Sequence, residues 1–86
     1  MKKNREKMID FNRDALIAEL IEESKSTKIY PDAAKVIANL VANDVEKWLS
    51  RRTMVTERDY KEIVHQKILK YNSDLAYIYL NRDKII

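Results

Sequence analysis

The residues best suited to chemistry are the charged ones that crowd the N-terminus. Positions 2–7 have an excess of three positive charges, while the rest of the chain carries 13 basic and 13 acidic residues. A basic arm on a neutral body attracts phosphate groups, whether they belong to a nucleotide or to a nucleic acid. A solvated start of the chain is the alternative explanation. The charged residues of this arm are Lys2, Lys3, Arg5, Glu6 and Lys7.

A second basic pair, Arg51 and Arg52, follows the longest predicted helix. Arginines at this place complement the negative end of a helix dipole and need no ligand. Nucleic-acid binding would need an exposed basic helix, whereas the helices on either side of this pair carry acids about as often as bases. Nucleic-acid binding through the N-terminal arm is therefore our third hypothesis for function.

Residues that perform catalysis or hold metal ions are scarce. His65 is the only histidine and the sequence has no cysteine or glycine, so neither a Cys–His pair nor a glycine-framed serine nucleophile can form. Glu22 and Glu23 lack a spacing at which further ligands would converge on one ion. We therefore predict no catalytic residue, no metal site and no enzymatic activity. We expect His65 on a helix surface or half-buried.

The aromatic residues could stack on a nucleic-acid base. They recur at helical intervals, however, in a chain with only one phenylalanine, and this pattern is more typical of a protein core. We therefore expect the core to contain Tyr30, Trp48, Tyr60, Tyr71, Tyr77 and Tyr79.

Length and composition indicate what kind of body carries these residues. A chain of 86 residues makes one domain, 1–86. With no glycine and one proline it lacks the positions that tight hairpins and phosphate-binding loops require, which favours helices. The longest apolar run, Leu75–Leu80, is far shorter than the roughly 18 residues of a membrane span, and no apolar signal segment opens the sequence. We expect a cytoplasmic protein without membrane contact.

Hydrophobic periodicity predicts four helices, at residues 11–26, 31–50, 57–70 and 74–83. Pro31 suits the first position of the second helix. Thr56 is the expected cap of the third helix, and either Asp10 or Asn12 caps the first. The predicted fold is mainly α, a compact four-helix bundle, to which residues 2–10 could add a short β-hairpin or lid.

The second predicted helix carries two stripes that would face its neighbours. Small residues recur at intervals of four, a spacing that lets another helix approach closely. The small stripe is Ala34, Ala38 and Ala42, and the larger apolar residues beside it are Ile37, Leu40, Val41, Val45, Trp48 and Leu49.

Three segments in order along the chain resemble the ATP-cone, the small nucleotide-sensing module found at the N-terminus of ribonucleotide reductases and in the repressor of their genes. The family's lysine-arginine-aspartate-glycine hairpin and the phenylalanine that follows it are similar to Lys3–Glu6 and Phe11–Asn12, with matching spacing up to Leu16. Its valine-threonine helix start, followed by aliphatic positions, resembles Val55–Thr56 with Tyr60, Ile63 and Val64. Its closing alanine-tyrosine-isoleucine stretch resembles Ala76–Ile78 or, two residues on, Ile78–Leu80.

The resemblance implies a four-helix bundle, covered by a small N-terminal sheet, that binds ATP or dATP as an allosteric signal without hydrolysing it. Carried over by position, Lys3 would meet the phosphates and Asn12 would be the polar residue after the hairpin. Thr56 would offer a hydroxyl to the nucleotide, and Lys61 would be a polar helix position facing it.

Three positions depart from the family pattern. Glu6 stands in place of the hairpin glycine, Asn4 in place of its arginine, and Ala15 in place of a helix lysine near the phosphates. These changes remove two cations and add an acid where phosphate charge must be neutralised. Our first hypothesis is therefore a non-enzymatic regulatory module with either a functional or a degenerate nucleotide site. The second is a helical module that binds no ligand and uses the alanine stripe and the apolar C-terminus to pair with itself or another protein.

Overall fold

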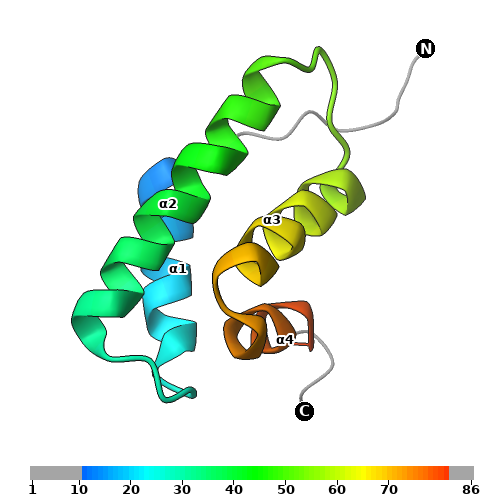
Figure 1. The fold of residues 1–86 in the computed structure, drawn as a ribbon. Coiled ribbons are helices and arrows are strands. Elements are labelled where there is room, and N and C mark those ends of the chain that lie inside the picture. The colour runs from blue at the N-terminus through cyan, green and yellow to red at the C-terminus, as the bar shows by residue number, and fades with distance from the viewer. Residues whose placement is uncertain (1–10, 82–86) are drawn as a thin grey trace.

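The computed structural model describes residues 11–81, which form four α-helices and no strand (Figure 1). The helices are α1 (Arg13–Ser24), α2 (Pro31–Ser50), α3 (Glu57–Tyr71) and α4 (Ser73–Asn81). The predicted mainly α four-helix bundle is thus confirmed. The N-terminal hairpin or lid, predicted for residues 2–10, lies outside the described residues.

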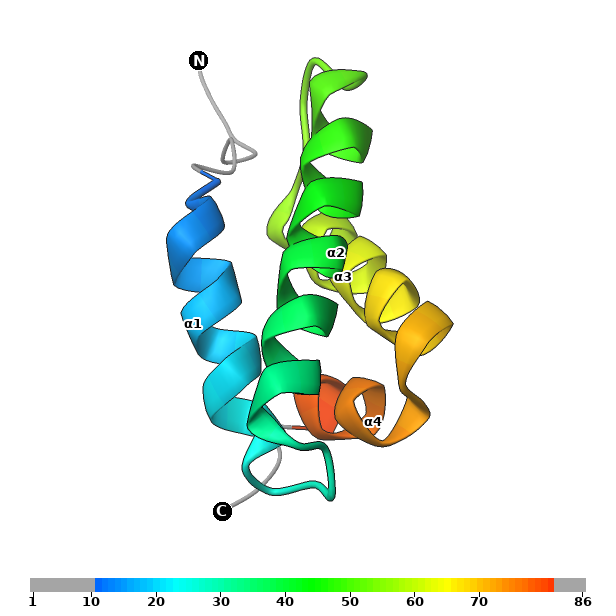
Figure 2. The same cartoon turned by 60° about the vertical axis from the view of Figure 1, so that its left-hand side comes forward.

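The four helices close a ring around one core. α1 contacts α2 and α4, and α3 contacts the same two helices. α2 has 20 residues and is therefore about 30 Å long at 1.5 Å per residue. Figures 1 and 2 show α2 along the length of the molecule, with α4 at the end where α2 begins.

Side-chain caps fix where α1 and α3 begin, and a proline marks the start of α2. The Asn12 Oδ1 atom accepts a hydrogen bond from the backbone N–H of Ala15 at 3.0 Å, so Asn12 rather than Asp10 caps α1. Thr56 caps α3 as expected, its Oγ1 accepting from the N–H of Asp59 at 3.1 Å. α2 begins with Pro31, whose missing N–H costs nothing at a helix start.

Side-chain hydrogen bonds stabilise the turns between helices, where other proteins often use glycine. After α1, the Thr27 hydroxyl donates to the carbonyl of Ser24 at 2.6 Å and accepts from the N–H of Ile29 at 3.1 Å. Asn72 both ends α3 and starts α4: its N–H donates to the carbonyl of Ile68 at 2.8 Å, and its Oδ1 accepts from the N–H of Leu75 at 2.9 Å. A chain without glycine can therefore still turn sharply.

The core draws on all four helices. The alanine stripe of α2 is fully inside the bundle, with Ala34 2% and Ala38 and Ala42 each 0% exposed, so this stripe serves close packing within the domain. The expectation that it pairs with another chain is therefore wrong. Partly buried side chains, Trp48, Tyr60 and Tyr71 among them, pack around the centre. The fully buried side chains of largest volume are Leu20, Val41, Val45, Val64, Ile68 and Leu75.

Three predicted core residues, Tyr30, Leu40 and Tyr77, are in fact exposed, and so is Leu80. Leu40 lies one turn after exposed Val36 on α2 and is 39% exposed. Tyr30 lies in the link before Pro31 and is 80% exposed. Tyr77 and Leu80 face outward from α4, which buries Leu75, Ala76 and Tyr79 instead.

No helix within residues 11–81 combines the length and the apolar character that crossing a membrane would require.

Candidate functional site

An aromatic contact brings together the starts of two helices. The rings of Phe11 and Tyr60 meet edge to face, with their centroids 6.2 Å apart. Phe11 directly precedes the cap of α1, and Tyr60 lies one turn after the cap of α3. Asn12 and Thr56, two predicted site residues, therefore lie in one region. We call Phe11, Asn12, Thr56 and Tyr60 the helix-start junction.

The polar groups of the helix-start junction suit an anion only in part. Each cap uses its oxygen to accept a backbone N–H, which leaves the Asn12 NH2 group and the Thr56 O–H as hydrogen-bond donors. The partial positive charge at a helix start favours an anion. Acidic residues in the first turns oppose it: Asp14 in α1 and Glu57 and Asp59 in α3. The junction therefore needs an additional cation if it is to bind phosphate.

Lys61 lies on the exposed side of α3, beside an open hollow of about 660 Å³. This volume falls within the roughly 300 to 1,000 Å³ of small-molecule sites. Half-buried His65 also lines the hollow, as does Leu80 from α4. The remaining lining residues are Glu57, Arg58 and Glu62, so positive and negative side chains are mixed there. Lys3, the other predicted cation of the site, lies outside the described residues.

A second surface is far more uniform in charge. Between the second half of α2 and the second half of α3 lies a hollow of about 260 Å³. We call it the basic groove. Five cations and one acid line it together with Trp48: Lys47, Arg51, Arg52, Lys67, Lys70 and Asp44.

Asp44 connects two side chains of α3 to α2 at the wall of the basic groove. Asp44 on α2 accepts a hydrogen bond from the hydroxyl of Tyr71 at 2.8 Å and one from Lys70 Nζ at 3.5 Å. Partial burial favours the neutral form of Asp44, but the hydrogen bond from Tyr71 and the positive charge of Lys70 outweigh it and lower the pKa of Asp44. The charge of Asp44 in turn raises the pKa of Lys70, and its hydrogen bond raises the pKa of Tyr71. At neutral pH the three side chains thus hold α2 and α3 together.

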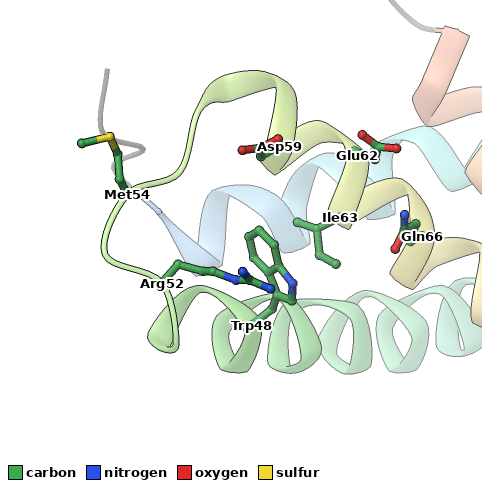
Figure 3. Close-up of a pocket in the computed structure, with 7 residues that line it drawn as sticks. All are labelled: Trp48, Arg52, Met54, Asp59, Glu62, Ile63 and Gln66. Carbon is green, nitrogen blue, oxygen red and sulfur yellow. The ribbon is translucent and has the colours of Figure 1, made fainter. Parts of the chain in front are cut away.

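A cation–π pair lies at the edge of the basic groove. The guanidinium carbon of Arg52 lies 4.5 Å from the centre of the Trp48 ring. Figure 3 shows this pair beneath α3, facing a neighbouring hollow of about 320 Å³ that Asp59 and Glu62 also line. Acidic side chains therefore bound the Trp48–Arg52 pair on one side, and the cations of the groove bound it on the other.

The basic groove is not predicted by the sequence, although the spacing of its cations is a signal for it. Lys67 and Lys70 are spaced i, i+3 on α3 and share one helix face. Lys47 lies in the last turn of α2, and Arg51, four residues later, caps the end of that helix. The sequence does not indicate that these two helix faces pack against each other.

No protein-family model, curated protein or solved structure matches this chain. Within residues 11–81, no three His, Cys, Asp or Glu side chains form a group that could hold a metal ion. The predicted lack of enzymatic activity and of a metal site stays a prediction, as does the resemblance to the ATP-cone.

Proposed function

We propose that this domain is a non-enzymatic regulatory module that binds an adenine nucleotide, ATP or dATP, at the helix-start junction. The phosphates would lie near Lys3 and Lys61, while Asn12 and Thr56 donate hydrogen bonds to them. The proposal includes a cytoplasmic location, with which the absence of cysteine agrees.

One observation carries this proposal: the Phe11–Tyr60 contact joins two segments that are 49 positions apart in sequence and that hold Asn12 and Thr56. They belong to two of the three segments that carry the resemblance to the ATP-cone. Both caps retain hydrogen-bond donors. Lys61 lines a hollow of suitable volume, but neither Asn12 nor Thr56 is among the residues that line it. The non-enzymatic part rests on the sequence, which offers one histidine and no cysteine.

Titration calorimetry of the full chain with ATP, dATP and GTP tests the proposal. Hydrogen bonds to charged groups contribute roughly 1.5 to 3 kcal/mol, so Lys3→Ala or Lys61→Ala should each weaken ATP binding about 10- to 150-fold. Lys35→Ala, an exposed lysine on the first half of α2, is the matched control and should bind normally. Absence of heat with all three nucleotides at millimolar concentration would contradict the proposal.

A gain-of-function variant sharpens this test. Ala15 is exposed in the first turn of α1, at the position where the family has a lysine. Ala15→Lys restores that cation and should strengthen ATP binding about tenfold, the equivalent of 1.4 kcal/mol. Ala18→Lys is exposed on the same helix, about one turn further on, and should have a smaller effect. Equal effects of the two lysines would show long-range attraction instead of a site.

A second candidate function is protein–protein interaction, which one observation favours. Exposed apolar side chains recur at helical spacing as Val36 and Leu40 on α2 and as Tyr77 and Leu80 on α4. Such pairs on adjacent turns can form an interface. Analytical ultracentrifugation should then show self-association that Leu40→Glu abolishes, while Asn39→Glu leaves it unchanged. A monomer at all concentrations would argue against pairing with itself.

A further inference from the structure

We propose that the basic groove binds the phosphate backbone of nucleic acid, without reading its bases. This surface differs from the N-terminal arm that the sequence suggested for such binding. It is also distinct from the helix-start junction, so the inference does not depend on the proposed nucleotide site.

The first argument is the segregation of charge. Residues 11–81 carry 11 basic and 11 acidic side chains, so this part of the chain has no net charge. Five of those cations line the basic groove with only one acid, which gives the groove a formal charge of +4. A concentrated positive field on a neutral body is typical of surfaces that attract phosphates.

The end of α2 explains only part of this cluster. A helix C-terminus carries about half a negative charge, which one nearby cation already offsets. Lys47, Arg51 and Arg52 exceed that requirement. Lys67 and Lys70 come from α3 and have no part in it, so the helix dipole leaves most of the positive charge unexplained.

The second argument is that contacts within the domain hold two of the cations in place. Trp48 holds the guanidinium of Arg52 over its ring, and Asp44 holds the ammonium of Lys70. Stacked arginines keep the N–H groups at their edge directed outward and can donate two of them to a phosphate. Because these side chains are already ordered, binding costs less conformational entropy.

The same geometry argues against base recognition. Trp48 is half-buried and Arg52 covers one face of its ring, so the indole is poorly placed to stack on a base. The cations instead come from both sides of the groove, from the end of α2 with the two residues after it and from the second half of α3, which suits a polyanion. Binding should therefore be independent of sequence and strongly dependent on salt.

The lining of the groove favours nucleic acid over an acidic protein. The centres of protein–protein interfaces are depleted in charged residues and rich in apolar ones. Interfaces with nucleic acid are more polar and more positive. Apart from Trp48, every side chain that lines the groove is charged.

Fluorescence anisotropy with the full chain and a labelled DNA duplex tests this inference. In low salt the duplex should bind, and log K should fall with log salt at a slope of about −0.9 per phosphate contact. Lys47→Gln with Arg51→Gln should weaken binding roughly 10- to 100-fold and reduce the slope by about 2. The matched control is Lys28→Gln with Lys35→Gln, which removes the same charge from exposed positions outside the groove and should change neither quantity by a comparable amount.

Four outcomes would overturn the inference. The first is no duplex binding by the unaltered chain, and the second is equal loss in the groove and control variants. The third is loss only when Lys2, Lys3, Arg5 and Lys7 are replaced by Gln, which would assign binding to the arm. The fourth is displacement of the duplex by poly-glutamate at equal charge concentration, which would indicate an acidic protein partner. Circular dichroism of each variant confirms that the helices remain.

Discussion

The helix-start junction and the basic groove both offer hydrogen-bond donors to phosphate, but they are built in opposite ways. At the junction, the oxygens of Asn12 and Thr56 already serve as helix caps, and acidic residues lie in the same first turns. In the groove, cations dominate, and the one acid, Asp44, is paired with Tyr71 and Lys70.

This difference shows that a sequence motif can reveal the junction, whereas only the folded structure reveals where charges gather in the groove. The junction follows from local patterns, since a cap and its helix lie within a few residues of each other. The groove depends on two helices packing side by side, so its cations are separate in sequence and adjacent only in the fold. Because residues 11–81 have no net charge, their composition does not reveal that cations gather in the groove.

The largest expected loss of stability comes from a substitution in the core, which supports both surfaces. Ile68 is fully buried on α3, so Ile68→Ala should lower the free energy of unfolding by about 2 to 5 kcal/mol. Leu69, its neighbour, is 51% exposed, and Leu69→Ala should change stability by less than about 0.5 kcal/mol. Urea denaturation measures both. Similar losses in the two variants would mean that α3 does not pack as described.

A smaller loss of stability is expected at Thr56, where two substitutions test the helix cap and ATP binding separately. Thr56→Ala removes the hydroxyl that accepts the N–H of Asp59 and should cost about 1 kcal/mol, whereas Thr56→Ser retains this bond and most of the stability. If the junction also binds ATP, Thr56→Ser should retain binding too. Thermal unfolding with and without ATP makes the comparison. A Thr56→Ala variant as stable as the unaltered chain would contradict the capping role.

A loss of stability similar to that of Thr56→Ala at neutral pH, but smaller in acid, is expected at the wall of the groove. Tyr71→Phe removes the hydroxyl that donates to Asp44, which should raise the pKa of Asp44 and cost about 1 kcal/mol at neutral pH. Because the folded-state pKa of Asp44 is lowered below 3.8, its stabilising effect is present above that pH and is lost as the pH falls through the folded value.

The difference between Tyr71→Phe and the unaltered chain should therefore shrink in acid. Denaturant unfolding at neutral pH and at about pH 2 measures it. Tyr77→Phe, which changes an exposed tyrosine, is the control and should have no effect at either pH. A difference between Tyr71→Phe and the unaltered chain that is the same at both pH values would show that the hydroxyl does not act through Asp44.

Much of the fold could be predicted because its determinants are local. Pro31 and Thr56 predict the starts of α2 and α3, and the alanine stripe predicts a tightly packed face of α2. The outward orientation of Leu40 and Tyr77 could not be predicted, because hydrophobic spacing does not say how wide a face the neighbouring helices cover.

The candidate site could be predicted only in part, for the same reason. Thr56 and Asn12 are recognisable as polar residues at helix starts, but nothing in the sequence indicates that Phe11 meets Tyr60. The contact of Lys70 with Asp44 likewise depends on the antiparallel course of α2 and α3, which brings together residues 26 positions apart.

The central claim is that this domain has two separate surfaces for phosphate, and nuclear magnetic resonance titration tests it most directly. Amide spectra of the labelled full chain would be followed as ATP or a DNA duplex is added. We predict that ATP shifts the amides of Asn12, Thr56 and Lys61, while the duplex shifts those of Lys47, Arg51 and Lys67. Shifts by both ligands at one common set of residues, or no shift with either ligand, would contradict the account.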